Sequence, residues 1–280
     1  MNMFLATLLS PLIGGILLGL IDHPRLAARI NVATGVSTFV FSLLLAVQVL
    51  DVKSVDAMGG WFHLDAYNVF LVALTTFVGM TTTIFSGPYM RHELEGGRVD
   101  RLRLRLYHSM FQLFQFGMLL GFTSNNIGVL WVSLELATLA TVLLVSLYRT
   151  PASIAAAWKY FILCGMGIAL ALFGTVLVYF TSSTVLGHGN EALTWTLLYA
   201  HAAELDPAVM SIAFCFLMVG YGTKVGLPRC TPGCPMRTAK APHPYPPCSP
   251  ACCSISPCMR WCAARCWWTV PPAQTWPATS

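Results

Sequence analysis

The sequence is poor in charge. Only 10% of its 280 residues are Asp, Glu, Lys or Arg, against roughly 25% in an ordinary soluble domain. Hydrophobic residues make up 56% of the chain, and the mean hydropathy is +0.67. A soluble fold has too little interior to bury that much apolar surface, so the composition excludes an ordinary soluble protein and indicates a membrane protein.

Acidic residues are missing from the end of the chain. All 11 acidic residues lie before Leu227, together with 11 of the 16 Lys and Arg and two of the 10 cysteines, Cys164 and Cys215. Residues 228–280 hold the other five bases, eight cysteines and 12 of the 17 prolines. No helix of useful length survives that proline density. We therefore expect two parts: a membrane domain over residues 1–227 and a disordered tail over 228–280.

Long apolar runs are what the first part contains. Seven stretches are long enough to cross a bilayer, and they lack the alternation of a barrel strand, so the predicted fold is an all-α membrane protein with about seven transmembrane helices. The first stretch lacks the basic start and the cleavage site of a signal peptide, so we expect it to be retained. The fourth is short and holds Gln112 and Gln115, which we expect to bond to a neighbouring helix. The stretches are residues 3–20, 30–50, 66–85, 107–122, 126–148, 156–180 and 208–227.

Positive charge is scarce in alternate loops. The second, fourth and sixth loops hold one base, Lys53, whereas the first, third and fifth hold eight arginines. The positive-inside rule then places the arginine-bearing loops and the tail in the cytoplasm and the N-terminus outside, in the cell inner (plasma) membrane. The regular alternation itself supports seven crossings. The arginines are Arg25, Arg29, Arg91, Arg98, Arg101, Arg103, Arg105 and Arg149.

Three ionisable residues stand out inside the predicted spans: Glu135, Lys159 and Lys224. A charge at the bilayer centre costs at least about 2.5–3.5 kcal/mol, so such residues usually face a wet cavity or a partner. Glu135 lies roughly 14 Å into its predicted helix, near the bilayer midplane. Its structural alternative is a hydrogen bond to Ser133 or Thr138.

The two lysines each have a structural alternative as well. Lys159 lies near the end of its span and can extend its long side chain to the interface. Lys224 lies among Gly220, Gly222 and Gly226, which we expect to loosen the helix and expose backbone groups to a cavity; the alternative is close glycine packing beside an interfacial lysine. Desolvation favours a neutral lysine amine and a nearby carboxylate favours the ammonium, which is the coupling that a proton relay needs.

Three motifs carry a family resemblance. They are Ser124-Asn125-Asn126 with Leu130-Trp131-Val132-Ser133-Leu134-Glu135-Leu136-Ala137-Thr138, then Ala156-Ala157-Trp158-Lys159-Tyr160-Phe161, and Gly222-Thr223-Lys224-Val225-Gly226-Leu227. Over residues 1–227 the chain resembles the antiporter-like subunits of complex I, Mrp-type cation/proton antiporters and membrane-bound hydrogenases. The stretch from Trp158 to Gly165 is most similar to hydrogenase-4 component F.

The resemblance implies a function and a set of site residues. It makes Glu135 and Lys224 the charged pair of a proton channel, with Lys159 as an accessory, in a non-catalytic subunit of an oxidoreductase complex. It implies partners among the membrane and peripheral subunits of a hydrogenase or complex I-like assembly, and no cofactor, metal or nucleic acid. Two alternatives stay open: an Mrp-type sodium/proton antiporter subunit, and an inactive truncated product.

The tail departs from the family pattern. The family continues after Leu227 with a Pro-Leu-His-x-Trp-Leu-Pro-Asp-Ala-His signature, whereas this chain continues Pro228-Arg229-Cys230-Thr231-Pro232. The segment from Arg229 can be encoded by a choice of codons that, read from the last base of the Arg229 codon, gives Leu-His-Thr-Trp-Leu-Pro-Asp-Ala. We therefore expect a single-base slip near Pro228, after which the chain is read out of frame.

A metal module is the rival interpretation of the tail. Its spacing matches none of the usual Cys-x2-Cys pairings, and the tail has no core to position the ligands. A disulfide framework is disfavoured by the predicted cytoplasmic location. The candidate ligands are His243, Cys252, Cys253, Cys258, Cys262 and Cys266.

Overall fold

The computed structural model describes residues 2–52 and 54–225. These residues form two compact units, Met1–Gly165 and a second unit that begins at Met166. Each unit is described by itself. The predictions about the tail, 228–280, concern residues outside the described part of the chain.

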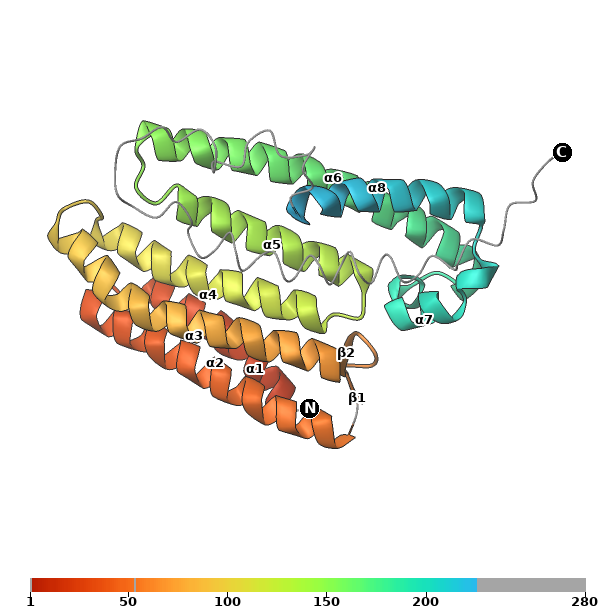
Figure 1. The fold of residues 1–280 in the computed structure, drawn as a ribbon, viewed down its shortest axis with the longest axis horizontal. Coiled ribbons are helices and arrows are strands. Elements are labelled where there is room, and N and C mark those ends of the chain that lie inside the picture. The colour runs from red at the N-terminus through yellow and green to blue at the C-terminus, as the bar shows by residue number, and fades with distance from the viewer. Residues whose placement is uncertain (1, 53, 226–280) are drawn as a thin grey trace. The chain divides into compact units, whose positions relative to one another are not determined.

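Long helices make up most of the first unit. Figure 1 shows α1 to α5 running alongside one another. The helices are α1 (Asn2–Leu20), α2 (Pro24–Val52), α3 (Ala66–Glu95), α4 (Arg101–Thr123), α5 (Ile127–Val145) and the first part of α6 (Pro151–Leu186). The second unit contains the rest of α6, η1 (Asn190–Leu193), α7 (Trp195–Ala200), η2 (Ala202–Glu204) and α8 (Pro207–Val225).

The predicted all-α membrane fold is confirmed. Each of the seven predicted stretches falls on a helix, and six helices of the described residues are long and apolar enough to cross a membrane. The exception is α4, a continuous helix whose apolar run contains Gln112 and Gln115. It extends over 23 residues but begins with Arg101, Arg103 and Arg105. The predicted count of about seven is therefore close to the six that length and composition support.

Proline and polar caps place the ends of several helices. Pro24, Pro151 and Pro207 are the first residues of α2, α6 and α8, where the missing N–H costs nothing because it would have no intrahelical partner. Asn126 caps α5, since its Oδ1 accepts hydrogen bonds from the amides of Gly128 and Val129. These local signals separate the long apolar runs into distinct helices.

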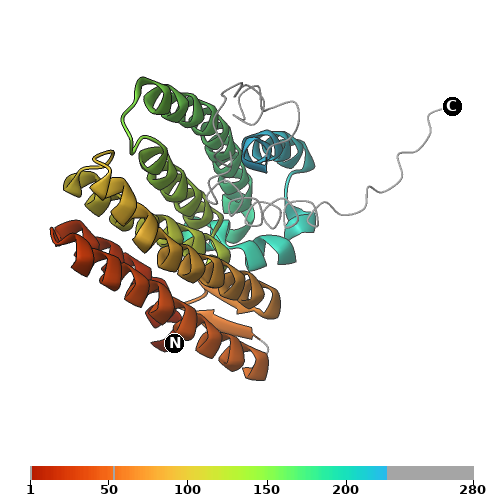
Figure 2. The same cartoon turned by 60° about the vertical axis from the view of Figure 1, so that its left-hand side comes forward.

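The first unit is built around α4. Helix α1 packs against α2 and α4, α2 packs against α3, and α4 also contacts α3 and α5. The side view in Figure 2 shows these helices as neighbours. Near the turns that follow α3 and α5, the buried residues Met90, Val99, Leu104 and Leu147 form a hydrophobic cluster.

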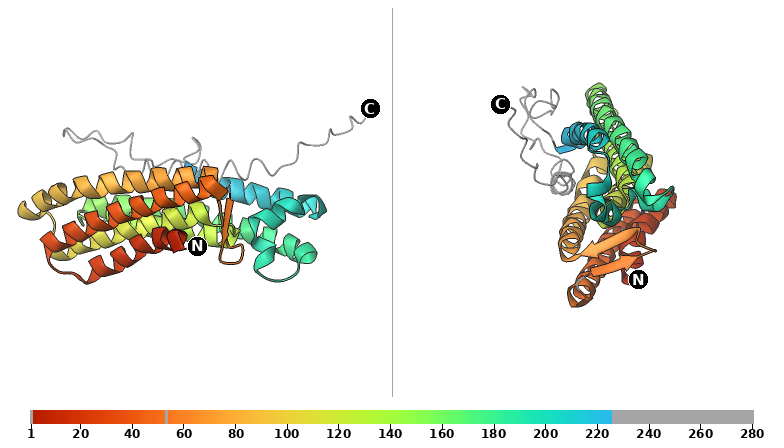
Figure 3. Two further views of the ribbon diagram at one scale, coloured as in Figure 1. Left: turned by 90° about the horizontal axis from the view of Figure 1, so that it is seen from below. Right: turned by 90° about the vertical axis from the view of Figure 1, so that its right-hand side faces the viewer.

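A β-hairpin between α2 and α3 was not predicted from the sequence. Strands β1 (Ser54–Ala57) and β2 (Phe62–Asp65) pair antiparallel, and Figure 3 shows them at one end of the helices. The amide of Asn125 donates to the Trp61 carbonyl at 2.8 Å, and its side chain donates to the Gly60 carbonyl at 2.9 Å. The hairpin is thus bonded to the junction between α4 and α5.

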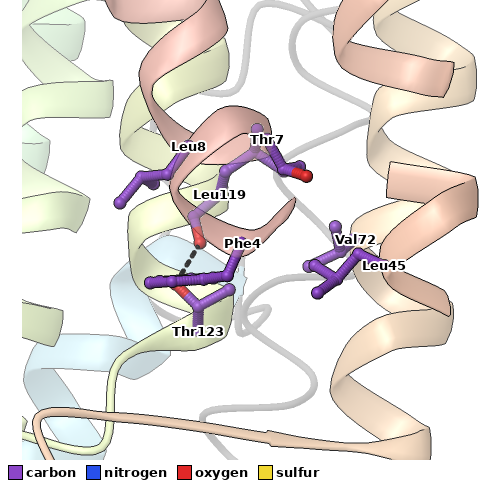
Figure 4. A pocket seen from close by; sticks show the side chains of 7 residues that line it. All are labelled: Phe4, Thr7, Leu8, Leu45, Val72, Leu119 and Thr123. Atoms are coloured by element: carbon purple, nitrogen blue, oxygen red, sulfur yellow. Dashed lines mark hydrogen bonds between the residues drawn. The ribbon is translucent and has the colours of Figure 1, made fainter. Parts of the chain in front are cut away.

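One small pocket of the first unit is mostly apolar (Figure 4). Its two hydroxyl groups are already bonded within their own helices, because Thr7 donates to the Met3 carbonyl and Thr123 to the Leu119 carbonyl. None of its lining residues is ionisable, so the pocket is not a candidate site for proton chemistry. The lining residues are Phe4, Thr7, Leu8, Leu45, Val72, Leu119 and Thr123.

Candidate functional site

Glu135 lies in the middle of α5. It is the ninth of the helix's 19 residues, about 12 Å along the axis from Ile127. Two glycines of α4 bring that helix close to α5: a Cβ on Gly117 would lie 3.2 Å from the Ser133 carbonyl oxygen, and a Cβ on Gly121 would lie 2.8 Å from Ser133 Oγ. This close contact packs α5, the helix that carries Glu135, against α4.

The carboxylate of Glu135 has an unsatisfied oxygen. Its Oε2 is buried and has no hydrogen-bond partner among the residues that the structure describes. The two hydroxyls of the structural alternative donate elsewhere, since Ser133 Oγ donates to the Leu130 carbonyl at 2.6 Å and Thr138 Oγ1 to the Leu134 carbonyl at 2.7 Å. Each hydroxyl has one proton to donate. Both of these bonds go to the backbone of α5, and the functional role of Glu135 stays a prediction.

Lys159 lies on the first turns of α6 and is exposed. It is the ninth residue of the helix, about 12 Å along the axis from Pro151. Its neighbour Trp158 is 60% exposed. An exposed lysine beside an exposed tryptophan fits the interfacial alternative, because tryptophan is enriched at the membrane–water interface.

Lys224 lies in the last turn of α8, in the second unit. The expected loosening by glycine is not observed within the described residues, because α8 is an α-helix through Val225. Gly220 instead allows a close approach to α6: a Cβ there would lie 2.6 Å from the Ala171 amide nitrogen. Gly220 is therefore packed closely against α6, and the role of Lys224 stays a prediction.

The structure does not bring the three residues into one described site. Glu135 and Lys159 belong to the first unit and Lys224 to the second. The pairing of Glu135 with Lys224 therefore stays a prediction. Among the described residues, no group of three or more His, Cys, Asp or Glu side chains could hold a metal ion.

Two buried ionisable residues were missed by the sequence analysis. His108 is 1% exposed on α4, within the predicted fourth span, and Glu93 is 4% exposed near the end of α3. A histidine inside an apolar run was the available signal for the first. Glu93 gave no such signal, because its pairing with Arg98 at 2.9 Å depends on the turn between α3 and α4.

Comparison with known protein families finds a match over the part of the chain that holds the three motifs. A family profile described as "NADH:quinone oxidoreductase/Mrp antiporter, TM" matches residues 124–229, which include Glu135, Lys159 and Lys224. The hydrogenase-4 component F homologue of Methylacidiphilum infernorum is 47% identical over 222 residues, which cover 79% of this chain and 45% of that protein.

A more distant relative and a solved structure extend the comparison. A putative antiporter subunit of Staphylococcus saprophyticus is 27% identical over 240 residues, covering 81% of this chain and 44% of the relative. The Mrp complex of a Dietzia species contains a chain with the same fold, at a TM-score of 0.70 and 16% identity, over 95% of this chain and 48% of that one. This protein spans about half the length of the curated relatives that it matches most fully. Over residues 124–229 the chain is similar to the NADH:quinone oxidoreductase/Mrp antiporter family of transmembrane proteins.

Proposed function

We propose that this chain is a proton-translocating membrane subunit of a hydrogenase-4-like or NADH:quinone oxidoreductase-like assembly. The observation that carries the proposal is the buried, unsatisfied carboxylate oxygen of Glu135 in the middle of α5. A polar group without a partner is costly in an apolar interior, and intramembrane carboxylates usually serve an ion pathway. The 47% identity to a hydrogenase-4 component F homologue favours this assembly over others.

The proposed mechanism is a relay in which Glu135 and Lys224 exchange a proton along a hydrated axis, with Lys159 as an accessory group. A carboxylate near the lysine stabilises the ammonium, and its withdrawal releases the proton. The electron chemistry belongs to partner subunits, so this subunit itself needs no redox cofactor. The subunit then works only within its complex, with the other membrane and peripheral subunits as partners.

The relay is tested by proton uptake into membrane vesicles that contain the assembled complex. Glu135→Gln and Lys224→Ala are each expected to abolish uptake while the complex still assembles. Glu191→Gln is the matched control, because it makes the same chemical change at an exposed glutamate in η1. Uptake that is unchanged in both relay variants would sink the proposal.

A sodium/proton antiporter subunit is the second candidate, favoured by the 27% identity to the staphylococcal antiporter subunit over most of this chain. The two functions differ in what drives transport. Uptake that requires an electron donor and is independent of sodium supports the redox-linked assembly. Exchange that is driven by a sodium gradient without an electron donor supports the antiporter.

We further propose that the arginine-bearing loops face the cytoplasm of the inner membrane and that the N-terminus faces outside. The turn between α3 and α4 and the start of α4 carry Arg98, Arg101, Arg103 and Arg105, whereas the segment between α6 and α8 carries Glu191 and Glu204. An epitope tag inserted at Gly97 is expected to bind antibody only after the cells are permeabilised, and a tag at Gly189 in intact spheroplasts. The opposite pattern would reverse the orientation.

A further inference from the structure

Three polar side chains form a row along one face of α4. His108, Gln112 and Gln115 lie at positions i, i+4 and i+7, which share a face of an α-helix. All three side chains belong to residues that are no more than 3% exposed. Gln112 Nε2 donates to Oδ1 of Asn31 on α2 at 2.8 Å, so Asn31 joins the row.

The row lies on the side of α4 that faces away from α5. Gly117 and Gly121, which contact α5, come nine residues after His108 and Gln112, and positions nine residues apart lie on opposite sides of a helix. The row is surrounded instead by the first three helices. Asn31 reaches it from α2, Gly15 of α1 contacts Gln112, and Gly79 of α3 lies beside Gln115.

Each member of the row has a buried polar atom without a hydrogen-bond partner in the part of the chain that the structure describes. The atoms are Asn31 Nδ2, His108 Nδ1, Gln112 Oε1 and Gln115 Nε2. Buried polar atoms of folded proteins nearly always have a partner, either protein or water. Four such atoms on one face of α4 and its neighbour therefore point to a shared ligand.

The chemistry of the row identifies the class of ligand. The amide nitrogens of Asn31 and Gln115 donate, Gln112 Oε1 accepts, and the imidazole nitrogen of His108 takes either role. The row has no carboxylate to hold a metal ion and no Lys or Arg to hold an anion. Water both donates and accepts, and an internal water typically makes about three hydrogen bonds to otherwise unsatisfied groups.

The absence of a side chain on Gly79 leaves room for the amide of Gln115. A Cβ on Gly79 would lie 2.0 Å from Oε1 of Gln115, so any larger residue would displace that amide. The row begins near the arginine-bearing end of α4, since His108 comes seven positions after Arg101, or about 10 Å along the axis. It reaches Gln115 about 10 Å further along the helix.

We propose that the interior of α1 to α4 binds a file of internal water molecules along Asn31, His108, Gln112 and Gln115, on the opposite side of α4 from Glu135's helix. Such a file hydrates the bundle from the arginine-bearing end to the middle of α4. It stands apart from the Glu135 and Lys224 relay, so its test does not depend on proton transport.

The test is hydroxyl-radical labelling of the full chain in membranes, with radicals generated from water by a brief X-ray pulse and the products read by mass spectrometry. His108 is expected to be oxidised because water lies beside it. Met118, which is 2% exposed on the same helix, is the internal control. Methionine reacts more readily with these radicals than histidine does, so it is labelled first if solvent enters generally.

Two variants complete the test. Gln112→Leu removes the central polar group at similar size and is expected to lower the labelling of His108 to the level of Met118. Gln115→Leu serves the same purpose if Gln112→Leu does not fold. His108 that is as protected as Met118 in the native chain overturns the proposal. So does labelling of both residues, and so does labelling of His108 that neither variant lowers.

Discussion

Oε1 of Glu93 accepts a hydrogen bond of 2.9 Å from Nη1 of Arg98. The pair closes the turn that joins α3 to α4, with the glutamate side chain 5% exposed and the arginine 58% exposed. The arginine therefore partly neutralises a carboxylate that the fold has removed from water, next to the hydrophobic cluster of Met90, Val99, Leu104 and Leu147.

Removal of Arg98 is expected to destabilise the first unit. Arg98→Ala leaves the buried Glu93 carboxylate without its ion-pair partner, which we expect to cost about 1–3 kcal/mol of unfolding free energy. The loss is measured by denaturant unfolding in detergent, followed by helical circular dichroism. Arg101→Ala, at an exposed position three residues later, is the control and is expected to stay within about 0.5 kcal/mol of the native chain. Equal stability of the two variants would contradict this role of the ion pair.

Tyr148 is expected to lower the stability of the folded protein at alkaline pH. Its hydroxyl lies 3.1 Å from that of Tyr89, and burial, followed by this hydrogen bond, raises the pKa of Tyr148 above its ordinary value of 10.0. Above about pH 10 the unfolded chain loses a proton that the folded chain keeps, so the free energy of unfolding falls as the pH rises. The contribution of Tyr148 to stability is full below pH 10 and declines above it.

Tyr148→Phe is therefore expected to make stability less dependent on pH between 9 and 11. The measurement is the unfolding midpoint across that range. Tyr199→Phe is the control, because Tyr199 is 64% exposed. A steep alkaline decline that persists unchanged in Tyr148→Phe would show that other groups cause it.

We predict that a side chain at Gly220 would destabilise the close contact between α6 and α8 in the second unit. A Cβ there would lie 2.6 Å from the Ala171 nitrogen and 2.7 Å from the Gly167 oxygen, and backbone atoms cannot rotate away as a side chain can. Gly220→Ala is expected to cost about 1–3 kcal/mol. At Gly165 a Cβ would meet no described atom within 4 Å, so Gly165→Ala is expected to be neutral or to stabilise by up to about 1 kcal/mol. Thermal unfolding compares them, and a cost at Gly165 equal to that at Gly220 would contradict the packing argument.

The coding DNA tests the proposed division at Leu227. If residues 228–280 are read out of frame, the shifted frame of that DNA is expected to encode Leu-His-Thr-Trp-Leu-Pro-Asp-Ala, beginning at the last base of the Arg229 codon. A shifted frame that lacks this signature would overturn the frame hypothesis. Zinc that is retained stoichiometrically by the expressed chain would instead favour the metal-binding interpretation of the tail.

The helices could be predicted because their signals are local. Apolar runs of membrane-spanning length, together with Pro24, Pro151 and Pro207 at helix starts, are properties of the sequence itself. The predicted bond of Gln112 to a neighbouring helix is also confirmed, by its hydrogen bond to Asn31. The hairpin at residues 54–65 was missed because its strands have four residues each and lie between much longer apolar runs.

The candidate site was predictable only in part. Glu135 was predicted because a carboxylate in an apolar span is unusual, and the hydroxyls of Ser133 and Thr138 donate to backbone carbonyls of the same helix. Burial of Glu93 and His108 depends on which helix faces meet, which no single stretch of sequence specifies. For Lys224, the sequence suggested a loosened helix, whereas the close contact of Gly220 with α6 shows why glycine is needed there.

The hairpin between α2 and α3 also constrains the order in which the chain matures. Its carbonyls at Gly60 and Trp61 accept hydrogen bonds from Asn125, some sixty residues later. During synthesis the hairpin therefore leaves the ribosome before Asn125 does. Helices α3 and α4 must be inserted before Asn125 can bond to the hairpin. A nascent chain arrested before residue 125 is expected to lose the hairpin to protease, whereas one released after α5 keeps it.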